Sequence, residues 1–266
     1  MTVIEQALRK PSEVRLIPFL VAGDPDPDTT LDLLRLLDEE GVAVVELGVP
    51  YSDPLADGPV IQEAATRALT HGMNLSRVLA LAKTARESGV RVPLVLFSYV
   101  NPLIQMGFER FAKAAREAGI DGVIVPDLPV EENEALRTAC ADHGLDVIPL
   151  VAPTSRERVR MIAEQGQGFV YCVSSLGTTG VRDGFSRDVD AFLEEVRRVS
   201  PVPTVIGFGI SRPEHVRRFS RHADAVVVGS ALVRLIGERR DALQHPAKRE
   251  QALAEIRAFV RELKTE

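Results

Sequence analysis

Residues 44–61, VVELGVPYSDPLADGPVI, contain a strand, a loop and the start of a helix in direct succession. The stretch opens with an apolar run typical of a buried strand, interrupted by a carboxylate at Glu46. Gly48 and Pro50 end this strand in a turn-rich loop, and a helical pattern of apolar residues begins near Gln62. This order predicts a βα unit, the repeating element of α/β folds.

The same unit recurs along the whole chain. Eight short apolar runs have the length of strands, and helical patterns separate them. They span residues 16–21, 43–47, 92–97, 122–125, 146–150, 169–173, 204–208 and 225–228. With no linker or change of composition between them, they predict one (β/α)8 TIM-barrel domain over residues 1–266, with extra short helices. The main alternative is a doubly wound open sheet, but that fold usually has fewer strands, and no GxGxxG motif follows the first run.

Several of the predicted helices carry start and stop signals. Asp26 has the character of an N-cap, and Pro27 occupies the first helical position after it. A glycine closes many of the helical patterns, because the residue after a helix often adopts a left-handed conformation. These glycines are Gly41, Gly89, Gly119, Gly144 and, more loosely, Gly166.

Composition narrows the classes of partner. The 266 residues carry a net charge of −6, which argues against general binding to nucleic acids or anionic membranes. Cys140 and Cys172 have no metal or redox spacing and suggest reduced thiols. The first residues lack a signal-peptide layout, and no apolar run approaches about 18 residues. We therefore expect a protein of the cytoplasm that binds neither nucleic acid nor membrane.

Glu46 and Asp57 are the candidate catalytic residues, because they flank one strand-end loop, where barrel enzymes place their sites. A buried carboxyl group has a raised pKa and can exchange protons near neutral pH. Two carboxyl groups in different environments can divide the roles of acid and base. The alternatives are that Glu46 has its carboxylate in water and that Asp57, which precedes Gly58, is an ordinary turn residue.

Three glycine-rich segments after the last predicted strands suggest an anion site. They are GTTG at 177–180, GFGIS at 207–211, and Gly229–Ser230 before a helical pattern. Backbone N–H groups in such turns and at a helix N-terminus bind anions, and barrels often bind phosphate after strands seven and eight. Each turn alone is commonly structural, but the three together predict a phosphate site.

Other residues near the strand ends fit an apolar substrate pocket or, alternatively, an ordinary barrel core. They are Phe19, Ile61, Phe97, Tyr99, Ile124, Tyr171, Phe208 and Val227. The histidines lie in helical or turn contexts without the spacing of metal ligands, so no metal is predicted. They are His71, His143, His215, His222 and His245.

The motif ELGVPYSDPLADGPVIQ at residues 46–62 closely resembles the signature of the tryptophan synthase alpha chain family. The resemblance runs from about residue 16 to residue 235. It implies a cofactor-free cleavage of indole-3-glycerol phosphate to indole and glyceraldehyde 3-phosphate, with Glu46 and Asp57 as the catalytic carboxylates.

The resemblance also assigns binding roles. It places the substrate phosphate on Gly180, Gly209, Gly229 and Ser230, and it makes Tyr99 and Tyr171 contacts of the indole glycerol moiety. Thr179 matches the family threonine that hydrogen-bonds the catalytic Asp when the site closes. The chain departs from the family at Thr178, where Val is usual.

Family members dock on a pyridoxal-phosphate beta chain, which implies an alpha2beta2 heterotetramer. The positions that match the contact surface are Asp53, Pro54, Asn101 and Pro102. Two other functions remain open. One is a different phosphosugar barrel, such as an isomerase, which would lack the Glu46 and Asp57 signature. The other is a degenerate subunit that only activates a partner, against which the intact carboxylates argue.

Overall fold

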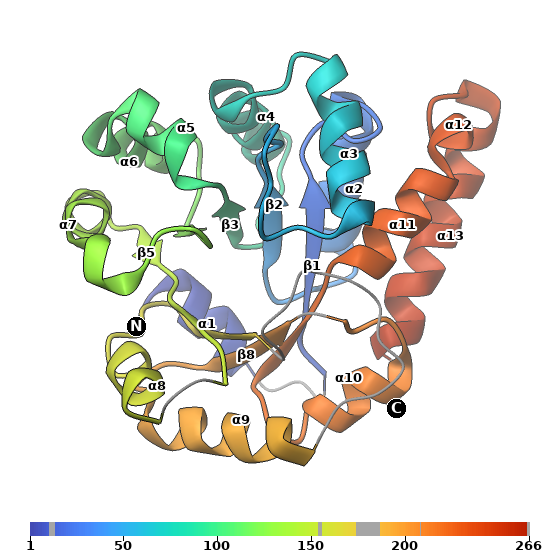
Figure 1. Cartoon of the computed structure of the whole chain (residues 1–266). Helices are drawn as coiled ribbons and strands as arrows, with labels where there is room; N and C mark the ends of the chain where they lie inside the picture. The colour runs from blue at the N-terminus through green and yellow to red at the C-terminus, as the bar shows by residue number, and fades with distance from the viewer. Residues whose placement is uncertain (11–13, 154–155, 174–186, 208, 265–266) are drawn as a thin grey trace.

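Parallel strands curl into a barrel that is ringed by helices (Figure 1). The computed structural model describes residues 1–10, 14–153, 156–173, 187–207 and 209–264. Three predicted site residues, Thr179, Gly180 and Phe208, lie outside these ranges. The sheet order is β5-β4-β3-β2-β1-β9-β8-β7-β6. Except at β5 and β6, which end this order, each strand therefore lies beside its neighbours in the chain, and β1 lies between β2 and the last strand, β9.

The strands and helices alternate as predicted. The strands are β1 (Leu16–Val21), β2 (Val45–Gly48), β3 (Leu94–Phe97), β4 (Gly122–Ile124), β5 (Asp146–Val147), β6 (Leu150–Val151), β7 (Val170–Val173), β8 (Thr204–Gly207) and β9 (Ala225–Val228). The helices are α1 (Val3–Arg9), α2 (Pro27–Glu39), α3 (Pro59–Thr70), α4 (Leu75–Glu87), α5 (Val100–Met106), α6 (Phe108–Glu117), the 3-10 turn η1 (Val130–Glu132), α7 (Glu134–Asp142), α8 (Arg156–Ala163), α9 (Arg187–Val199), α10 (Pro213–Phe219), α11 (Ser230–Glu238), α12 (Arg240–Leu243) and α13 (Pro246–Lys264).

The predicted barrel is confirmed, but its fifth strand is not continuous. Residues 146–150 were predicted as one strand, whereas β5 pairs with β4 and β6 pairs with β7. Pro149 stands between them and has no N–H to donate to a ladder. Ile148 N still donates to Val123 O at 2.9 Å, and Tyr171 N donates to Pro149 O at 2.9 Å. One bent segment therefore closes the ring between β4 and β7.

Strand register sets which side chains point into the barrel. Phe19 is paired with Glu46, and Gly48 is paired with Phe97. The rings of Phe19 and Phe97 meet edge to face, with their centroids 5.6 Å apart. A Cβ at Gly48 would lie only 2.7 Å from Phe19 Cζ, so only glycine leaves room for this ring. Because side chains alternate along a strand, Glu46 shares the interior with both aromatic rings.

The helix signals read from the sequence are largely confirmed. Asp26 caps α2 by accepting a hydrogen bond from Thr29 N. The expected left-handed glycines after helices have positive φ, and they are Gly41, Gly89, Gly119 and Gly144. At Gly166 the expectation was wrong, since the left-handed residue is Gly168, with φ of 65°. Gly166 instead allows close packing, because a Cβ there would lie 2.6 Å from a methyl of Val202.

Candidate active site

Glu46 lies in the interior wall of the barrel on β2. Only 1 % of its surface is exposed, and among the described residues nothing hydrogen-bonds its Oε1 atom. Burial raises the pKa of this carboxyl group to about 8. Glu46 therefore holds a proton at neutral pH that it can donate to a bound molecule.

Asp57 stands in the loop that follows β2 and is 6 % exposed. Burial raises its pKa to about 6, and a hydrogen bond from Tyr99 works in the opposite direction. The Tyr99 hydroxyl donates to Asp57 Oδ2 at 3.0 Å and accepts from Ala56 N at 3.0 Å. Gln62 makes a third hydrogen bond here, because its side-chain amide donates to Asp57 O at 2.7 Å. Asp57 is thus a carboxylate at neutral pH, held in place by two neighbouring segments.

Tyr171 on β7 brings the far wall of the barrel to the two carboxyl groups. Its pKa is raised well above the usual value, first by burial and then by the nearby charges of Glu46 and Asp57. A Cβ at Gly207 would come within 2.1 Å of the Tyr171 hydroxyl oxygen. Glycine at this position therefore permits Tyr171 to reach the interior beside β8.

The predicted apolar pocket residues also gather around the interior. Phe97 is paired with Ile124 across β3 and β4, and Val227 on β9 is paired with Ile17 on β1. All described members of the set are buried, and they are Phe19, Ile61, Phe97, Tyr99, Ile124, Tyr171 and Val227. The structure thus surrounds the two acidic groups with an apolar and aromatic wall.

The described part of the predicted phosphate site lies after β8 and β9. Gly209 has a φ of 84°, which side-chain-bearing residues rarely adopt. Gly229 precedes α11 and lies in ordinary contact with Phe19, since a Cβ there would be 3.7 Å from Phe19 Cβ. Ser230 is the first residue of α11, where free N–H groups and the helix dipole favour an anion.

The two loops predicted to bind a partner are joined to each other. Asn101 Nδ2 donates to the Tyr51 hydroxyl at 3.2 Å, and the Tyr51 ring stacks on Tyr99. Two large apolar side chains, missed by sequence reasoning, are exposed beside these loops. Leu55 is 85 % exposed and Ile104 is 59 % exposed. Only exposure marks them out, and exposure follows from the fold rather than from residue type.

Within the ranges that the structure describes, no three His, Cys, Asp or Glu side chains are grouped as a metal site would require. In the same ranges, every helix is too short or too polar to cross a membrane.

Comparison with known proteins decides the family. The model of the tryptophan synthase alpha chain family matches residues 6–266. The chain belongs to this family. The alpha chain of Halalkalibacterium halodurans is 53 % identical over 247 residues, which cover 93 % of each chain. The alpha chain of Bacillus subtilis is 49 % identical over 250 residues, 94 % of each chain.

Solved structures of the family share the fold. The subunit alpha structure from Legionella pneumophila has a TM-score of 0.84 and 36 % identity, covering 98 % of this chain and 99 % of the other. A tryptophan synthase complex from Pyrococcus furiosus contains a chain with a TM-score of 0.83 and 37 % identity, covering 94 % and 97 %. The activity of the family is the lyase reaction that cleaves indole-3-glycerol phosphate to indole and glyceraldehyde 3-phosphate.

Proposed function

We propose that Glu46 and Asp57 perform this cleavage as an acid–base group and an electrostatic stabiliser. The observation that carries the proposal is the burial of both carboxyl groups, of which only Asp57 accepts a hydrogen bond from Tyr99. Burial raises the pKa of Glu46 to about 8 and that of Asp57 to about 6. Between these values Glu46 is a neutral acid and Asp57 an anion, as a reaction with one proton donor and one charge stabiliser requires.

The chemistry balances with one shuttled proton. Glu46 gives its proton to C3 of the indole ring, which turns the ring into a positively charged electron acceptor. The bond between C3 and the side chain then breaks, its electron pair returns to the ring, and Glu46 takes the proton of the adjacent hydroxyl. That carbon becomes the aldehyde of glyceraldehyde 3-phosphate, and indole is released. Asp57 accepts the indole N–H and stabilises the positive charge on the ring.

Tyr99 acts as a positioning residue for Asp57, because its hydroxyl joins both the Asp57 carboxylate and the Ala56 backbone. The aromatic wall orients the ring, while Gly209, Gly229 and Ser230 would hold the phosphate at the other end. Remote phosphate binding supplies the energy that places C3 against Glu46. Thr179, Gly180 and Phe208 keep the roles that the resemblance implies.

Indole release is the direct test of this function. Purified chain is mixed with indole-3-glycerol phosphate, and indole and glyceraldehyde 3-phosphate are measured in parallel, with Glu46→Gln as the inactive control. We expect the two products in equal amounts. Formation of an isomerised sugar phosphate without indole would favour the alternative phosphosugar reaction. Absence of any turnover, even with a beta chain, would favour the degenerate subunit.

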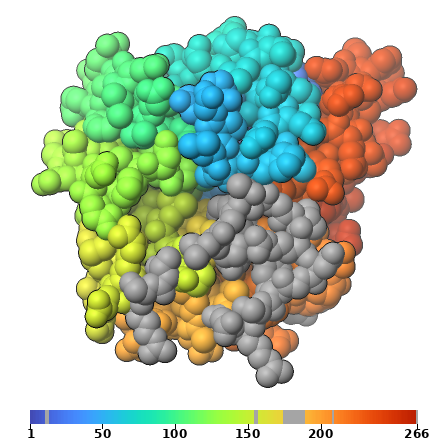
Figure 2. All heavy atoms as spheres, in the orientation of Figure 1, coloured from blue at the N-terminus to red at the C-terminus, as the bar shows by residue number. Residues whose placement is uncertain are grey.

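The family assembles as an alpha2beta2 complex with a beta chain, and we propose that this single-domain chain does so in the cytoplasm. The surface we assign to the beta chain comprises Asp53, Pro54, Leu55, Asn101 and Pro102. Figure 2 shows the loop after β2 at the centre of one face, beside α5. Leu55 supplies the exposed apolar anchor that an interface core needs.

We expect a beta chain bound at this surface to stimulate indole release strongly. The loop of Asp57 contains Pro50, Pro54 and Gly58 and projects Leu55 into solvent, so we expect it to sample several conformations when free. A partner that binds one conformation shifts the population towards it. We expect kcat for indole release to rise at least about tenfold with a cognate beta chain.

The matched variants for this assay are Asp53→Lys and Leu55→Ser. Both should abolish the stimulation and spare the turnover of the lone chain, because in the described structure the side-chain hydrogen bonds to Asp57 come from Tyr99 and Gln62 and not from these two residues. A lone chain that is already fast and gains nothing from a beta chain would contradict the prediction.

Ser230→Asp is expected to raise KM for indole-3-glycerol phosphate by roughly tenfold or more, because like charges repel strongly when close and partly buried. Ser230 is the better site for this test, since substitution at Gly209 would also strain its left-handed backbone. Ser230→Ala is the control and should change KM only modestly. Unchanged affinity of a folded Ser230→Asp chain for glycerol phosphate would place the phosphate elsewhere.

A further inference from the structure

The rings of Tyr51 and Tyr99 lie side by side after two neighbouring strands. The ladder between β2 and β3 reaches Val49, whose N donates to Phe97 O at 2.8 Å. Tyr51 and Tyr99 each follow this hydrogen bond by two residues, so the strand register brings the two rings together. The ring centroids are 5.2 Å apart and the planes meet at 27°, a stacked arrangement in the range that aromatic pairs prefer.

The Tyr99 hydroxyl links this stack to the candidate active site. It donates to Asp57 Oδ2 and accepts from Ala56 N, in both cases at 3.0 Å. Burial, followed by the charge of Asp57, raises the pKa of Tyr99 above its usual value, so the hydroxyl keeps its proton and remains a donor. Hydrogen bonds weaken steeply when they are misdirected, so the hydroxyl meets both partners only while the ring keeps one orientation.

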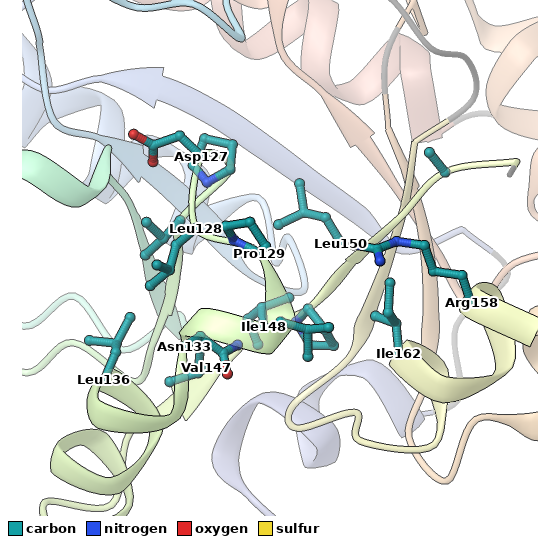
Figure 3. A pocket seen from close by; sticks show the side chains of 15 residues that line it. Asp127, Leu128, Pro129, Asn133, Leu136, Val147, Ile148, Leu150, Arg158 and Ile162 are labelled. Atoms are coloured by element: carbon teal, nitrogen blue, oxygen red, sulfur yellow. The ribbon is translucent and has the colours of Figure 1, made fainter.

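The backbone around Tyr99 is fixed by other residues. Asp127 Oδ1 accepts a hydrogen bond from Val100 N at 2.9 Å, and the Ser98 hydroxyl donates to Tyr99 O at 3.0 Å. Figure 3 shows the Asp127 carboxylate pointing away from Leu150, another lining residue of the neighbouring cavity. With the main chain held on both sides of Tyr99, the rotation of its side chain is what remains to be set.

The Tyr51 ring is placed to set this rotation. Asn101 Nδ2 donates to the Tyr51 hydroxyl at 3.2 Å, which holds the outer end of the ring. Among the described residues, the backbone–backbone hydrogen bonds of the turn 53–57 are local, and a hollow of about 370 Å³ lies between the loop and α3. The loop is therefore joined to its neighbour chiefly through the two tyrosines, and the stack restricts the plane of the Tyr99 ring.

We propose that Tyr51 is a positioning residue for the lyase reaction, because its ring packs on Tyr99 and keeps the Tyr99 hydroxyl on the Asp57 carboxylate. The inference deepens the proposed function and rests on it. Loop conformations that separate the two rings leave Asp57 with a misdirected hydrogen bond. The carboxylate that stabilises the positive indole ring is then less well placed and more easily protonated.

The pH profile of kcat/KM, measured with and without a beta chain, tests this role. The Tyr99 hydrogen bond lowers the pKa of Asp57, so Tyr51→Leu should move the acidic limb to higher pH, by roughly half a pH unit. The basic limb, which reports Glu46, should stay in place. Tyr51→Phe keeps the ring and should leave both limbs unchanged. Ser52→Ala, at the exposed next residue, is the matched control and should also leave both unchanged.

The double variant Tyr51→Leu/Tyr99→Phe shows whether Tyr51 acts through Tyr99. Once the Tyr99 hydroxyl is absent, Tyr51→Leu should displace the acidic limb no further, whereas a general disturbance of the loop would add its own effect. Additive displacements would overturn the inference. So would an acidic limb that Tyr51→Leu leaves in place, or one that Tyr51→Phe moves as far as Tyr51→Leu does.

A carboxyl ¹³C NMR titration of Asp57 gives the same information without turnover, with the signal assigned by its absence in Asp57→Asn. Suppose that the chain releases no indole, but that Tyr51→Leu still raises the pKa of Asp57. This result would overturn the proposed function and support the contact through Tyr99. An active chain in which Asp57 titrates identically in wild type and Tyr51→Leu would overturn the inference alone.

Discussion

Glu46→Gln is expected to lower kcat for indole release by about 10²–10⁴-fold, the usual contribution of a general acid–base group. Glutamine keeps the size of the side chain and has a neutral terminal group, as Glu46 has at pH values below its pKa of about 8. It cannot give a proton to C3 or take one from the hydroxyl. KM should therefore change little. Steady-state kinetics with and without a beta chain measure both constants, and turnover above about a tenth of wild type would rule out Glu46 as the proton shuttle.

Stability measurements provide the control for this variant. The folded pKa of Glu46 is about 8, against an ordinary value of 4.5, so the native state keeps a proton that the unfolded chain loses. This carboxyl group's favourable contribution is full below about pH 4.5 and is lost as the pH rises towards 8. Glutamine does not titrate, so Glu46→Gln removes this loss of stability at high pH. The free energy of unfolding of the variant at pH 8 should therefore exceed that of wild type by a few kcal/mol. Lost turnover in a more stable chain cannot be attributed to unfolding.

The sequence predicted the barrel because its evidence is local and repeated. Apolar runs, helix caps such as Asp26 and left-handed glycines such as Gly41 each depend on a few neighbouring residues. The break at Pro149 was missed because an apolar run shows length but not which strand each half pairs with. The error at Gly166 has the same origin, since close packing against Val202 is a contact between distant segments.

The same distinction between local patterns and contacts of distant segments applies to the candidate site. Glu46 stood out because a carboxylate is unusual in a buried strand, and Asp57 because it lies across the same strand-end loop from Glu46. Their different pKa values could not be predicted, because burial depends on which walls the barrel brings around each group. Nor does spacing show that Tyr99, 42 positions away, would donate to Asp57. The exposure of Leu55 likewise arises only from the folded arrangement.

Asp57→Asn is expected to lower kcat by about 10²-fold or more, because removing one group that stabilises transition-state charge typically costs that much. An amide oxygen can still accept from the Tyr99 hydroxyl, but it cannot neutralise the positive ring formed when C3 is protonated. The pH profile of kcat/KM distinguishes this role from a structural one. In wild type it should fall below about pH 6, as Asp57 gains a proton, and above about pH 8, as Glu46 loses one. Asp57→Asn should lose the acidic limb and keep the basic one. Tyr99→Phe should move the acidic limb to higher pH, since the Tyr99 hydrogen bond lowers the pKa of Asp57. An acidic limb that stays in place in both variants would mean that Asp57 does not carry the stabilising charge.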